Sequence, residues 1–555
     1  MQLVDRFTRL NYDSLEDFYE NYKITIPDNF NYAYDVIDEY ARLAPDQRAM
    51  IWVNDLGEEH IFTFADMARY SNKAANVLVK MGVRKGDPVL LLLKRRYEYW
   101  FIALGLMRIG AIQIPATHQL QKKDIVYRCN AADVRALICV GEDEVLGHVR
   151  ASVPECKALR SVAALGGEHE GFLNFDRMLS EASDVFERPA ERTTNDDIML
   201  MYFTSGTTGM PKMVAHDFRY PLGHVITGRF WHNLDDQSIH LTTADSGWAK
   251  CAWGKFYGQW IAGAVNFVYD FDRFNAKKML EMMSHYRLTS FCAPPTIYRF
   301  LIKEDMSQYD LSALKWATTA GEPLNPEVFN QFYRLTGVKI HEGFGQSETT
   351  PILLTPVWME PRPGSTGKPS PHYKIRLVDK DFHDVEDGEE GELCVDISEG
   401  RPAGLTMGYY RNPEKNKEVF AGGLYHTGDM AWRDEAGYYW FIGRSDDVIK
   451  SSGYRIGPFE VESALIEHPS VVECAITGVP DPIRGQVVKA TIMLAAGYQP
   501  SEELKKELQN HVKRVTAPYK YPRIIEFVDE LPKTISGKIQ RVKIRNEDEA
   551  RARKE

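Results

Sequence analysis

Apolar residues in the first third of the chain form short continuous runs that alternate with stretches of helical spacing. The runs at 88–93, 111–114 and 136–140 are apolar almost throughout, which is typical of strands buried on both faces. Between the first two runs, residues 97–109 have the spacing of an amphipathic helix. Strands that alternate with helices predict a parallel sheet covered by helices on both faces.

A second sheet of the same kind is indicated by an internal similarity. The segment LGLMRIGAIQIP at 104–115 resembles YGQWIAGAVNFV at 257–268, and each reads as a helix end, a Gly-Ala turn and a strand. Many αβ units share this pattern, so the similarity alone does not identify a duplication. We expect an α/β fold with two doubly wound subdomains that extend to about residue 364.

The pattern changes towards the C-terminus. Short strands such as KIRLVD and GELCVD alternate with Gly, Asp and Pro turns and predict a small, β-barrel-like subdomain over 365–443. Residues 448–555 contain helical and strand patterns of a small, mobile α+β C-terminal domain. We expect a hinge at 444–447 and a large N-terminal domain over 1–443.

Composition is consistent with an ordinary globular enzyme. Of the 555 residues, 44% are apolar and 26% are charged, which excludes a disordered chain and predicts three or more folding units. The formal net charge is −11 and the basic residues are dispersed. Nucleic-acid binding is therefore not expected, because binding to a phosphate backbone requires clustered Lys and Arg.

The seven cysteines contain no C-x-x-C pair, which argues against a zinc ribbon or a disulfide framework. No apolar run approaches the length of a membrane span, and the acidic N-terminal segment does not resemble a signal or matrix-targeting peptide. These features predict a cytoplasmic protein. The sequence does not distinguish a monomer from a homodimer.

The strongest local signal for chemistry is the segment at 202–212, YFTSGTTGMPK. Its glycines allow the backbone N–H groups to approach an anion, and its hydroxyls and lysine add donors and charge. The segment suits the β- and γ-phosphates of ATP, although it is not a P-loop of the Walker type. The candidate phosphate-binding residues are Thr204, Ser205, Gly206, Thr207, Thr208, Gly209 and Lys212.

Six further motifs follow in order, and together with this loop they resemble the adenylate-forming, or AMP-binding, superfamily. The motifs are AGEP at 320–323, GFGQSET at 343–349, YHTGD at 425–429, GRSDD at 443–447, SGYR at 452–455 and PKTISGK at 532–538. The superfamily includes acyl-CoA synthetases, beetle luciferases and nonribosomal adenylation domains. The resemblance is strongest to medium-chain acyl-CoA synthetases.

The resemblance implies a role for individual residues of the nucleotide site. Phe344 would stack on adenine, and the opposite wall would consist of Gly321, Glu322 and Pro323. Ser347 would donate to the α-phosphate. Glu348 would hold Mg²⁺, a hard cation that prefers carboxylate and phosphate oxygens. Asp429 would accept from both ribose hydroxyls, and Arg444 would add a second ribose contact.

The resemblance also implies catalytic and coenzyme A-binding residues. Lys538 would bridge the attacking carboxylate and the α-phosphate, whose repulsion must be cancelled in the transition state. Arg455 would meet the phosphate of the adenylate, and Asp446 would be the hinge about which the C-terminal domain rotates. The candidate residues for binding coenzyme A are Ser452, Gly453, Lys513 and Tyr521.

The acyl pocket is expected beside Gly345, where acetate-specific relatives have a tryptophan. A glycine at this position should leave room for a longer or branched acyl chain. Trp231, Trp248 and Trp253 would form an apolar wall, and Lys250 is an unusual residue for such a place. An aromatic acid such as benzoate is an alternative substrate.

The predicted function is that of an AMP-forming acyl-CoA synthetase. It would use ATP, Mg²⁺ and coenzyme A to activate a medium-chain or branched-chain carboxylic acid through an acyl-adenylate. Three other possibilities are an enzyme that loads a separate carrier protein, a non-catalytic ligand-sensing paralogue and a light-emitting oxygenase. Retention of Lys538, Glu348 and Asp429 argues against the non-catalytic paralogue.

Overall fold

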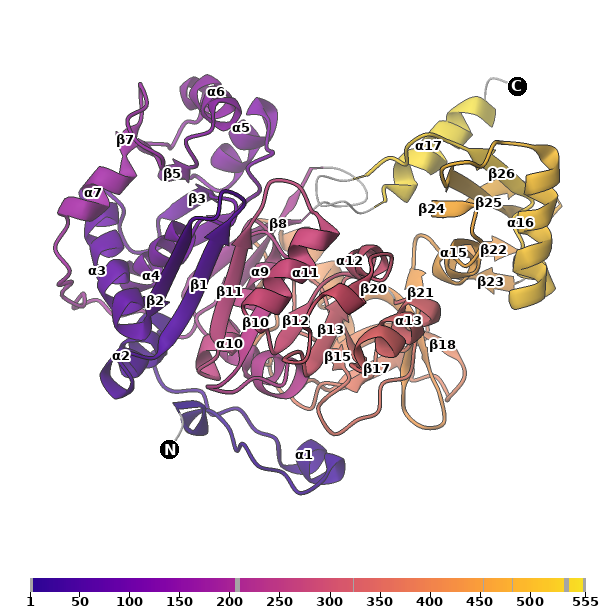
Figure 1. Ribbon diagram of the computed structural model, residues 1–555, viewed down its shortest axis with the longest axis horizontal. Helices are drawn as coiled ribbons and strands as arrows, with labels where there is room; N and C mark the ends of the chain where they lie inside the picture. Colours follow the sequence, from indigo (N-terminus) through magenta and orange to yellow (C-terminus); the bar gives the residue numbers. More distant parts are fainter. Residues whose placement is uncertain are drawn as a thin grey trace.

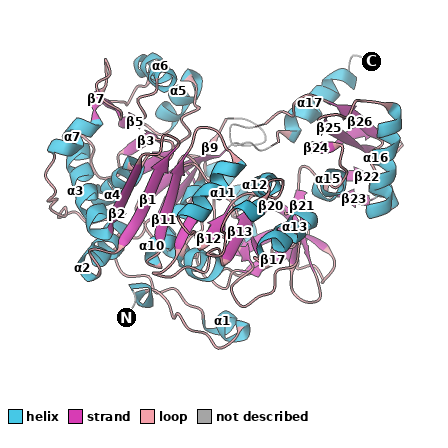
Figure 2. Ribbon diagram, viewed as in Figure 1, coloured by secondary structure: helices cyan, strands magenta, loops and turns pink. Residues whose placement is uncertain are grey.

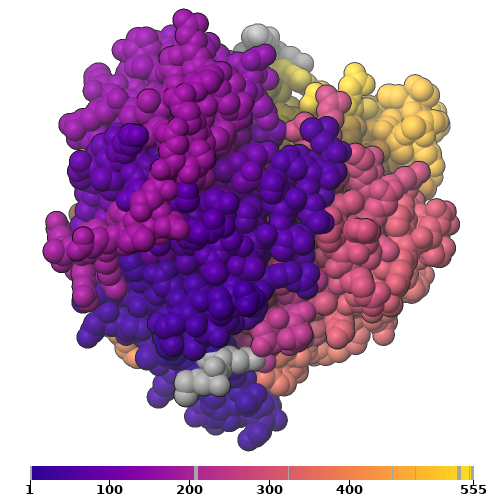
Figure 3. Space-filling view, turned by 60° about the vertical axis from the view of Figure 1, so that its left-hand side comes forward, coloured from indigo at the N-terminus to yellow at the C-terminus, as the bar shows by residue number. Residues whose placement is uncertain are grey.

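The computed structural model describes residues 3–204, 210–322, 324–452, 454–481, 483–533 and 539–552. Two large sheets with their helices form the main body, and a small unit at the C-terminus lies to one side of it (Figure 1). Figure 3 shows that N-terminal residues cover most of one face, with the C-terminal unit at its margin. No helix within these ranges is long and apolar enough to cross a membrane.

The first sheet has a parallel centre and antiparallel additions at one edge. Its strands are β3 (Pro88–Leu92), β4 (Ile112–Pro115), β5 (Ala136–Cys139), β6 (Ser161–Ala164), β7 (Leu173–Asn174), β8 (Ile198–Thr204), β9 (Lys212–Asp217) and β19 (Gly408–Tyr409). Among the described residues their order is β19-β9-β8-β4-β3-β5-β6-β7. The expected strands at 88–93, 111–114 and 136–140 are thus confirmed as neighbours in one parallel sheet.

The second sheet also has a parallel centre, with antiparallel strands at both edges. Its strands are β1 (Arg48–Asn54), β2 (Glu59–Thr63), β10 (Ile239–Thr242), β11 (Val265–Asp270), β12 (Ser290–Cys292), β13 (Trp316–Ala320), β14 (Ile340–Phe344), β15 (Leu353–Leu354) and β16 (Lys368–Pro369). In the described part of the chain their order is β16-β15-β14-β13-β12-β10-β11-β1-β2.

Helices separate and cover these two sheets (Figure 2). The helices of the main body are α1 (Leu15–Asn21), α2 (Glu39–Leu43), α3 (Phe64–Lys80), α4 (Glu98–Ile109), α5 (Lys122–Ala131), α6 (Asp143–Ser152), α7 (Phe175–Glu181), α8 (Tyr220–Gly223), α9 (Ala249–Lys255), α10 (Tyr257–Ile261), α11 (Ala276–His285), α12 (Pro295–Leu301), α13 (Pro326–Thr336) and α14 (Pro413–Val419). Along β3, Leu90 and Leu92 pack with α5 and α6, whereas Val89 and Leu91 pack with α3 and α4. Side chains of a strand alternate between faces, so one apolar run supplies two cores.

The β-rich region forms an open sheet rather than the expected barrel. It contains β17 (Ile375–Val378), β18 (Glu390–Asp396), β20 (Leu424–Arg433) and β21 (Tyr439–Arg444), all antiparallel. In the described residues the order β17-β18-β20-β21 leaves β17 and β21 unpaired with each other. A sheet of four strands is small for closure, which requires strong strand tilt and stagger.

The C-terminal unit is an α+β fold, as the sequence predicts. Its elements are β22 (Ile449–Ser451), β23 (Tyr454–Ile456), α15 (Pro458–Ile466), β24 (Val471–Asp481), β25 (Gly485–Leu494), α16 (Glu502–Val515), β26 (Ile524–Phe527) and α17 (Arg541–Ala552). Apolar residues of α15 and α16, including Leu465 and Leu508, pack on the sheet together with Ile476 and Ile492. The apolar spacing of both helices therefore fixes which face each one buries.

The strand pairing differs from the order in which the subdomains were expected to follow one another along the chain. The hairpin β1–β2 joins the second sheet, although the strands of the first sheet follow it in the chain. Strands β16 and β19 lie within 365–443 but pair with the second and first large sheets respectively. Local patterns predict the strands but not these long-range partners, so the boundaries at 364 and 443 remain predictions.

We expect the stability of the fold to fall on mild acidification because several histidines are buried. Burial lowers the pKa of His216 to about 4 and the pKa values of His232, His341 and His372 to about 3. Below pH ~6.5 these histidines bind protons in the unfolded chain but not in the folded chain. The free energy of unfolding therefore falls by up to ~1.4 kcal/mol per pH unit for each histidine. The midpoint of thermal unfolding should therefore drop between pH 7.5 and 5.5.

The matched variants for this prediction are His232→Gln and His60→Gln. Replacing the buried His232 should flatten the pH dependence of the unfolding midpoint, whereas replacing the more exposed His60 should leave it unchanged. A midpoint that does not vary with pH over this interval would contradict the expectation.

Candidate functional site

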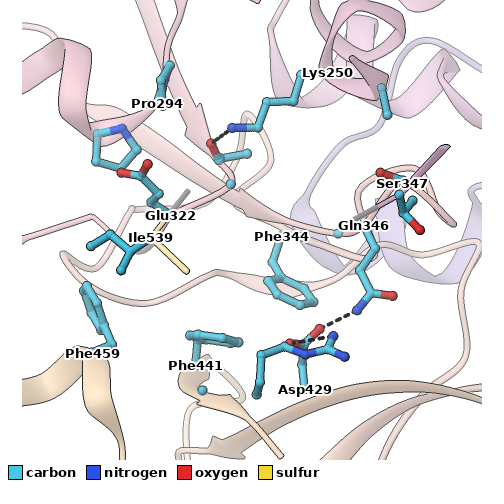
Figure 4. A pocket seen from close by; sticks show the side chains of 18 of the residues that line it. Lys250, Pro294, Glu322, Phe344, Gln346, Ser347, Asp429, Phe441, Phe459 and Ile539 are labelled. Carbon is cyan, nitrogen blue, oxygen red and sulfur yellow. Dashed lines mark hydrogen bonds and ion pairs between the residues drawn. The ribbon is translucent and has the colours of Figure 1, made fainter. Parts of the chain in front are cut away.

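A cavity of about 1750 Å³ lies where the second sheet, the β-rich sheet and the C-terminal unit meet (Figure 4). The carboxyl ends of β10, β12, β13 and β14 open into it, through Thr242, Cys292, Ala320 and Phe344. Open parallel sheets bind ligands at this edge because the strands end there and their loops diverge. The topology therefore determines where the site is formed.

All of the predicted nucleotide residues that the structure describes line this one cavity. These residues are Thr204, Lys212, Gly321, Glu322, Phe344, Ser347, Glu348, Asp429 and Arg444. Ser205, Gly206, Thr207, Thr208, Gly209 and Pro323 lie outside the described residues. Elements far apart in the sequence are thus brought together at the predicted site.

The predicted phosphate loop is bounded by a hairpin. Thr204 ends β8 and pairs directly with Lys212, which begins β9. The Lys212 ammonium lies 5.6 Å from the ring centroid of Tyr409. Burial, followed by the nearby Lys415, lowers the pKa of Lys212. A charged donor is therefore held at one end of the loop.

The predicted adenine walls are formed by β13 and β14. Gly321 follows β13 with a φ of +97°, and a Cβ atom at this position would collide with the Lys250 ammonium. Phe344 ends β14, and its ring lies 5.7 Å from that of Phe441 at an angle of 33° (Figure 4). Glu322 accepts a hydrogen bond from the Thr296 hydroxyl at 3.0 Å. The left-handed backbone explains why glycine is required at 321.

Glu348 offers a carboxylate that fits a Mg²⁺ ion. The residue is only 9% exposed, and its Oε1 accepts a hydrogen bond from the Tyr409 hydroxyl at 2.8 Å. Burial and the adjacent Glu348 raise the pKa of Tyr409, so the hydroxyl keeps its proton at neutral pH. This bond orients the carboxylate of a residue that lines the cavity, and carboxylate oxygens are the ligands that such a hard cation prefers.

The backbone next to Glu348 is held from two sides. The N–H of Thr406 donates to the Glu348 carbonyl at 2.7 Å, and His216 Nε2 lies 2.7 Å from the Ser347 carbonyl. Since a carbonyl only accepts, Nε2 of His216 carries the proton. These bonds fix the turn that presents Ser347 and Glu348.

Asp429 lies opposite this turn, on β20. Its Oδ2 accepts from Gln346 Nε2 at 2.5 Å, and Arg444 approaches Oδ1 at 3.4 Å (Figure 4). The Asp429 backbone N–H donates to the Thr427 hydroxyl at 3.1 Å. These hydrogen bonds and the nearby guanidinium fix the orientation of the Asp429 carboxylate.

Beside this carboxylate, Glu392, Cys394 and His426 carry ligand atoms that all lie within 4.8 Å of one another. Each of them already has a partner in the chain. His426 Nδ1 is 3.0 Å from Glu392 and 3.5 Å from Cys394, and Glu392 also accepts from the Gly428 N–H at 3.0 Å. We therefore interpret the group as a support for residues 427–429 rather than as a metal centre.

All five predicted acyl-pocket residues line the same cavity. They are Trp231, Trp248, Lys250, Trp253 and Gly345. The indole rings of Trp231 and Trp253 lie 6.3 Å apart and nearly perpendicular, at 81°. Lys250 donates to the Ala320 carbonyl at 3.0 Å, next to the predicted adenine wall (Figure 4).

The expected open space beside Gly345 is occupied. A Cβ atom at this position would lie 2.6 Å from Cη2 of Trp253 and 2.7 Å from the backbone oxygen of Thr350. A residue larger than glycine would not fit at position 345, because the Trp253 indole packs against it. The room for an acyl chain depends on this indole as well as on the glycine.

The predicted hinge and coenzyme A residues lie at different places. Asp446 lines the cavity, whereas Ser452, Lys513 and Tyr521 belong to the described residues outside its lining. The Lys513 ammonium lies 4.1 Å from the centroid of the Tyr521 ring. Ser452 has a φ of +52° and donates its N–H to the Arg484 carbonyl.

Other predicted residues of this region are described in part or not at all. The backbone of Arg455 pairs with Lys450 in the β22–β23 hairpin, but its side chain is not described. Gly453 and Lys538 lie outside the described residues. Their proposed roles therefore rest on the sequence motifs.

Sequence reasoning missed Gln346, Tyr409, Phe441 and Glu342. Gln346 is inside the motif at 343–349 and was identifiable from its position there, whereas no local signal marks Tyr409 or Phe441.

Glu342 is only 4% exposed, and burial raises its pKa well above the usual value. Among the described residues, the Oε2 atom of Glu342 has no hydrogen-bond partner. Its carboxyl group lies in the cavity lining close to Phe344 in the chain.

Comparison with known proteins agrees with this geometry. A family model described as AMP-binding enzyme matches residues 37–410, and one described as AMP-binding enzyme C-terminal domain matches residues 460–538. Acyl-coenzyme A synthetase ACSM3, mitochondrial, of Mus musculus is 41% identical over 98% of this chain and 94% of its own length. Acyl-coenzyme A synthetase ACSM5, mitochondrial, of Homo sapiens is 44% identical over 94% of this chain and 91% of its own length.

A solved structure extends this similarity to three dimensions. The anthranilate CoA ligase AuaEII in complex with anthranoyl-AMP has a TM-score of 0.87 and 31% identity, covering 95% of this chain and 99% of its own. The mitochondrial relatives do not confirm the expected cytoplasmic location. The matches span both the main body and the C-terminal unit. The chain therefore belongs to the AMP-binding enzyme family and, within it, to the acyl-coenzyme A synthetases.

Proposed function

We propose that the chain joins a medium-chain or branched-chain carboxylic acid to coenzyme A at the expense of ATP, with release of AMP and pyrophosphate. The observation that carries this proposal is the single cavity, in which the predicted nucleotide residues and the apolar tryptophan wall adjoin each other. An acid and a nucleotide bound there would lie next to each other, as a reaction between them requires.

In the first half-reaction, a carboxylate oxygen of the acid attacks the α-phosphorus of ATP. The bond from this phosphorus to the bridging oxygen of pyrophosphate breaks, which leaves an acyl-adenylate. Asp429 and Arg444 would hold the ribose, and Phe344 the adenine. Glu348 would bind Mg²⁺, which supplies charge neutralisation at the phosphates. Lys538 would bring together the two anions that react.

In the second half-reaction, the sulfur of coenzyme A attacks the acyl carbonyl carbon, AMP leaves, and the thiol proton is released. The C-terminal unit would rotate about Asp446 to admit coenzyme A. The pair Lys513–Tyr521 supports a contact with the nucleotide end of that substrate. Arg523 extends the basic cluster, since its guanidinium donates to the Tyr521 hydroxyl at 2.6 Å.

The expected class of acid follows from the lining of the acyl pocket. Trp231 is fully buried and Trp253 is only 6% exposed, and together they form an apolar part of the cavity wall. Such a surface binds a hydrocarbon chain because apolar area is buried. Its selectivity between acyl chains of different length should change only gradually with each methylene. An alkyl chain of medium length or with a branch would suit these walls.

An aromatic acid is the second candidate. The anthranilate ligase and a benzoate CoA ligase from Burkholderia xenovorans LB400, with a TM-score of 0.80 and 27% identity over 93% of this chain, support it. Perpendicular indole rings such as Trp231 and Trp253 also offer an edge and a face to an aromatic ring. A separate carrier protein as acyl acceptor is a further alternative.

The decisive experiment measures pyrophosphate and AMP release from ATP and Mg²⁺ with straight-chain, branched and aromatic acids, with and without coenzyme A. Medium or branched acids should give the highest kcat/KM, and AMP release should require coenzyme A. A maximum with benzoate-like acids would favour the second candidate. Pyrophosphate exchange without thioester formation would favour a carrier protein, and no reaction with any acid would refute the proposal.

We expect Trp253→Ala to shift the preference towards longer acids. Removing the indole would open the space beside Gly345, and each added methylene could then gain apolar contacts. The ratio of kcat/KM for an eight-carbon acid to that for a four-carbon acid should rise about tenfold or more. Steady-state kinetics with both acids would measure it.

The matched variant is Trp253→Phe, which opens less space and should give a smaller shift. The midpoint of thermal unfolding should be recorded for both variants, because deleting a buried indole also removes packing. An unchanged chain-length profile in a folded Trp253→Ala protein would show that this side chain does not limit the acyl pocket.

A further inference from the structure

The side-chain amide of Asn325 makes two hydrogen bonds in different directions. Its Oδ1 accepts from the Glu327 N–H at 2.7 Å and caps α13. Its Nδ2 donates to the carbonyl of Ser463 at 3.3 Å, in α15 of the C-terminal unit. A backbone N–H can only donate, so the cap determines which amide atom faces Ser463.

The carbonyl of Ser463 is one that α15 does not satisfy by itself. The helix ends at Ile466, and the N–H of Glu467 bonds to the Leu465 carbonyl instead of continuing to Ser463. The last carbonyls of a helix need partners from outside and form the negative end of its dipole. The amide N–H of Asn325 supplies such a partner, and Asn325 itself is only 6% exposed.

This hydrogen bond joins two parts that the proposed reaction requires to move apart. Within the described ranges, it is the one side-chain hydrogen bond between residues 3–443 and 448–552. Asn325 and Ser463 both line the cavity. Phe459 and Ile539, from the same side of the C-terminal unit, lie near Glu322 in the close-up view (Figure 4).

We propose that Asn325 is a positioning residue that holds the C-terminal unit in the arrangement for adenylate formation, and that its bond to Ser463 breaks before thioester formation. This inference rests on the proposed two-step reaction. Rotation about Asp446 would carry α15 away from α13, because the two helices lie on opposite sides of the hinge in the chain. The Asn325 side chain would continue to cap α13 during the rotation. Release of the C-terminal unit would therefore break only the hydrogen bond to Ser463.

The test is Asn325→Asp, measured separately in the two half-reactions. Aspartate caps helices as well as asparagine does, so α13 should remain intact. It replaces the amide donor with an acceptor that faces the Ser463 carbonyl, and this arrangement is repulsive. Single-turnover adenylate formation should slow about fivefold to tenfold, whereas conversion of supplied acyl-adenylate to thioester should be unchanged or faster.

Asn412→Asp is the matched control, because Asn412 also precedes a proline and caps a helix. Its Oδ1 accepts from the Lys415 N–H at 3.2 Å at the start of α14. This variant should leave both half-reactions at the wild-type rate, and both variants should unfold at the wild-type temperature.

Equal slowing of both half-reactions in Asn325→Asp, or no change in either, would overturn the inference. Slowing of adenylate formation alone in the Asn412 variant would also overturn it, because the effect would then not be specific to Ser463. Absence of both half-reactions from the wild-type protein would instead refute the proposed function, and the inference with it.

Discussion

Replacing Glu348 with glutamine is expected to lower kcat/KM for adenylate formation by about 100-fold to 1000-fold, the usual effect of removing an electrostatic contact to the transition state. The change removes one negative charge and keeps the shape of the side chain. Its backbone carbonyl would still accept from Thr406, so the local turn should persist. Pyrophosphate release at increasing Mg²⁺ concentrations would measure both the activity and the Mg²⁺ requirement.

Tyr409→Phe provides a graded comparison for this prediction. It removes the hydrogen bond that orients Glu348 while leaving the carboxylate charge in place. Activity should fall only about tenfold, the typical contribution of a hydrogen bond to a charged group. If Glu348→Gln left the Mg²⁺ requirement unchanged, the residue would not be the metal ligand.

Asp429→Asn should weaken the binding of AMP about 100-fold. A carboxylate can accept from two ribose hydroxyls at once, and each such bond to a charged group contributes about 1.5–3 kcal/mol. The amide would also lose its attraction to Arg444, which approaches the carboxylate at 3.4 Å in this structure. Isothermal titration calorimetry with AMP alone would measure the effect without requiring turnover.

Asp434→Asn is the control for this experiment. Asp434 is a partly buried aspartate that directly follows β20, the strand of Asp429, and it pairs with Arg362 at 2.8 Å. Replacing it removes the same charge from the same region, so the affinity for AMP should not change. A similar loss of affinity in both variants would point to general destabilisation of this sheet instead of a ribose contact.

The strands of the parallel sheets were predictable because they are buried on both faces. The run at 88–93 has apolar residues at every position, and its side chains alternate between two cores. The motifs likewise identified most of the cavity lining, since short stretches such as 343–349 carry several contact residues in sequence. Both signals are local, and each can be read without knowing the rest of the fold.

Contacts between distant residues were not predictable in this way. Nothing in the local sequence indicates that Trp253 fills the space beside Gly345, or that Tyr409 orients Glu348. Each of these pairs depends on which strands become neighbours. The barrel expectation was wrong for a related reason, because alternation and turns predict strands but not whether their sheet closes.

The return of the N-terminal hairpin to the second sheet affects how the chain is made. Strand β1 pairs in parallel with β11, so roughly 200 residues must leave the ribosome before the hairpin finds its partner, which takes about 10 to 40 s at ordinary rates of synthesis. During this interval the apolar face of the hairpin has no native neighbour in the second sheet. The nascent chain therefore exposes an unpaired strand edge early in translation, and we expect the yield of folded protein to depend on protection of this edge until β11 has been made.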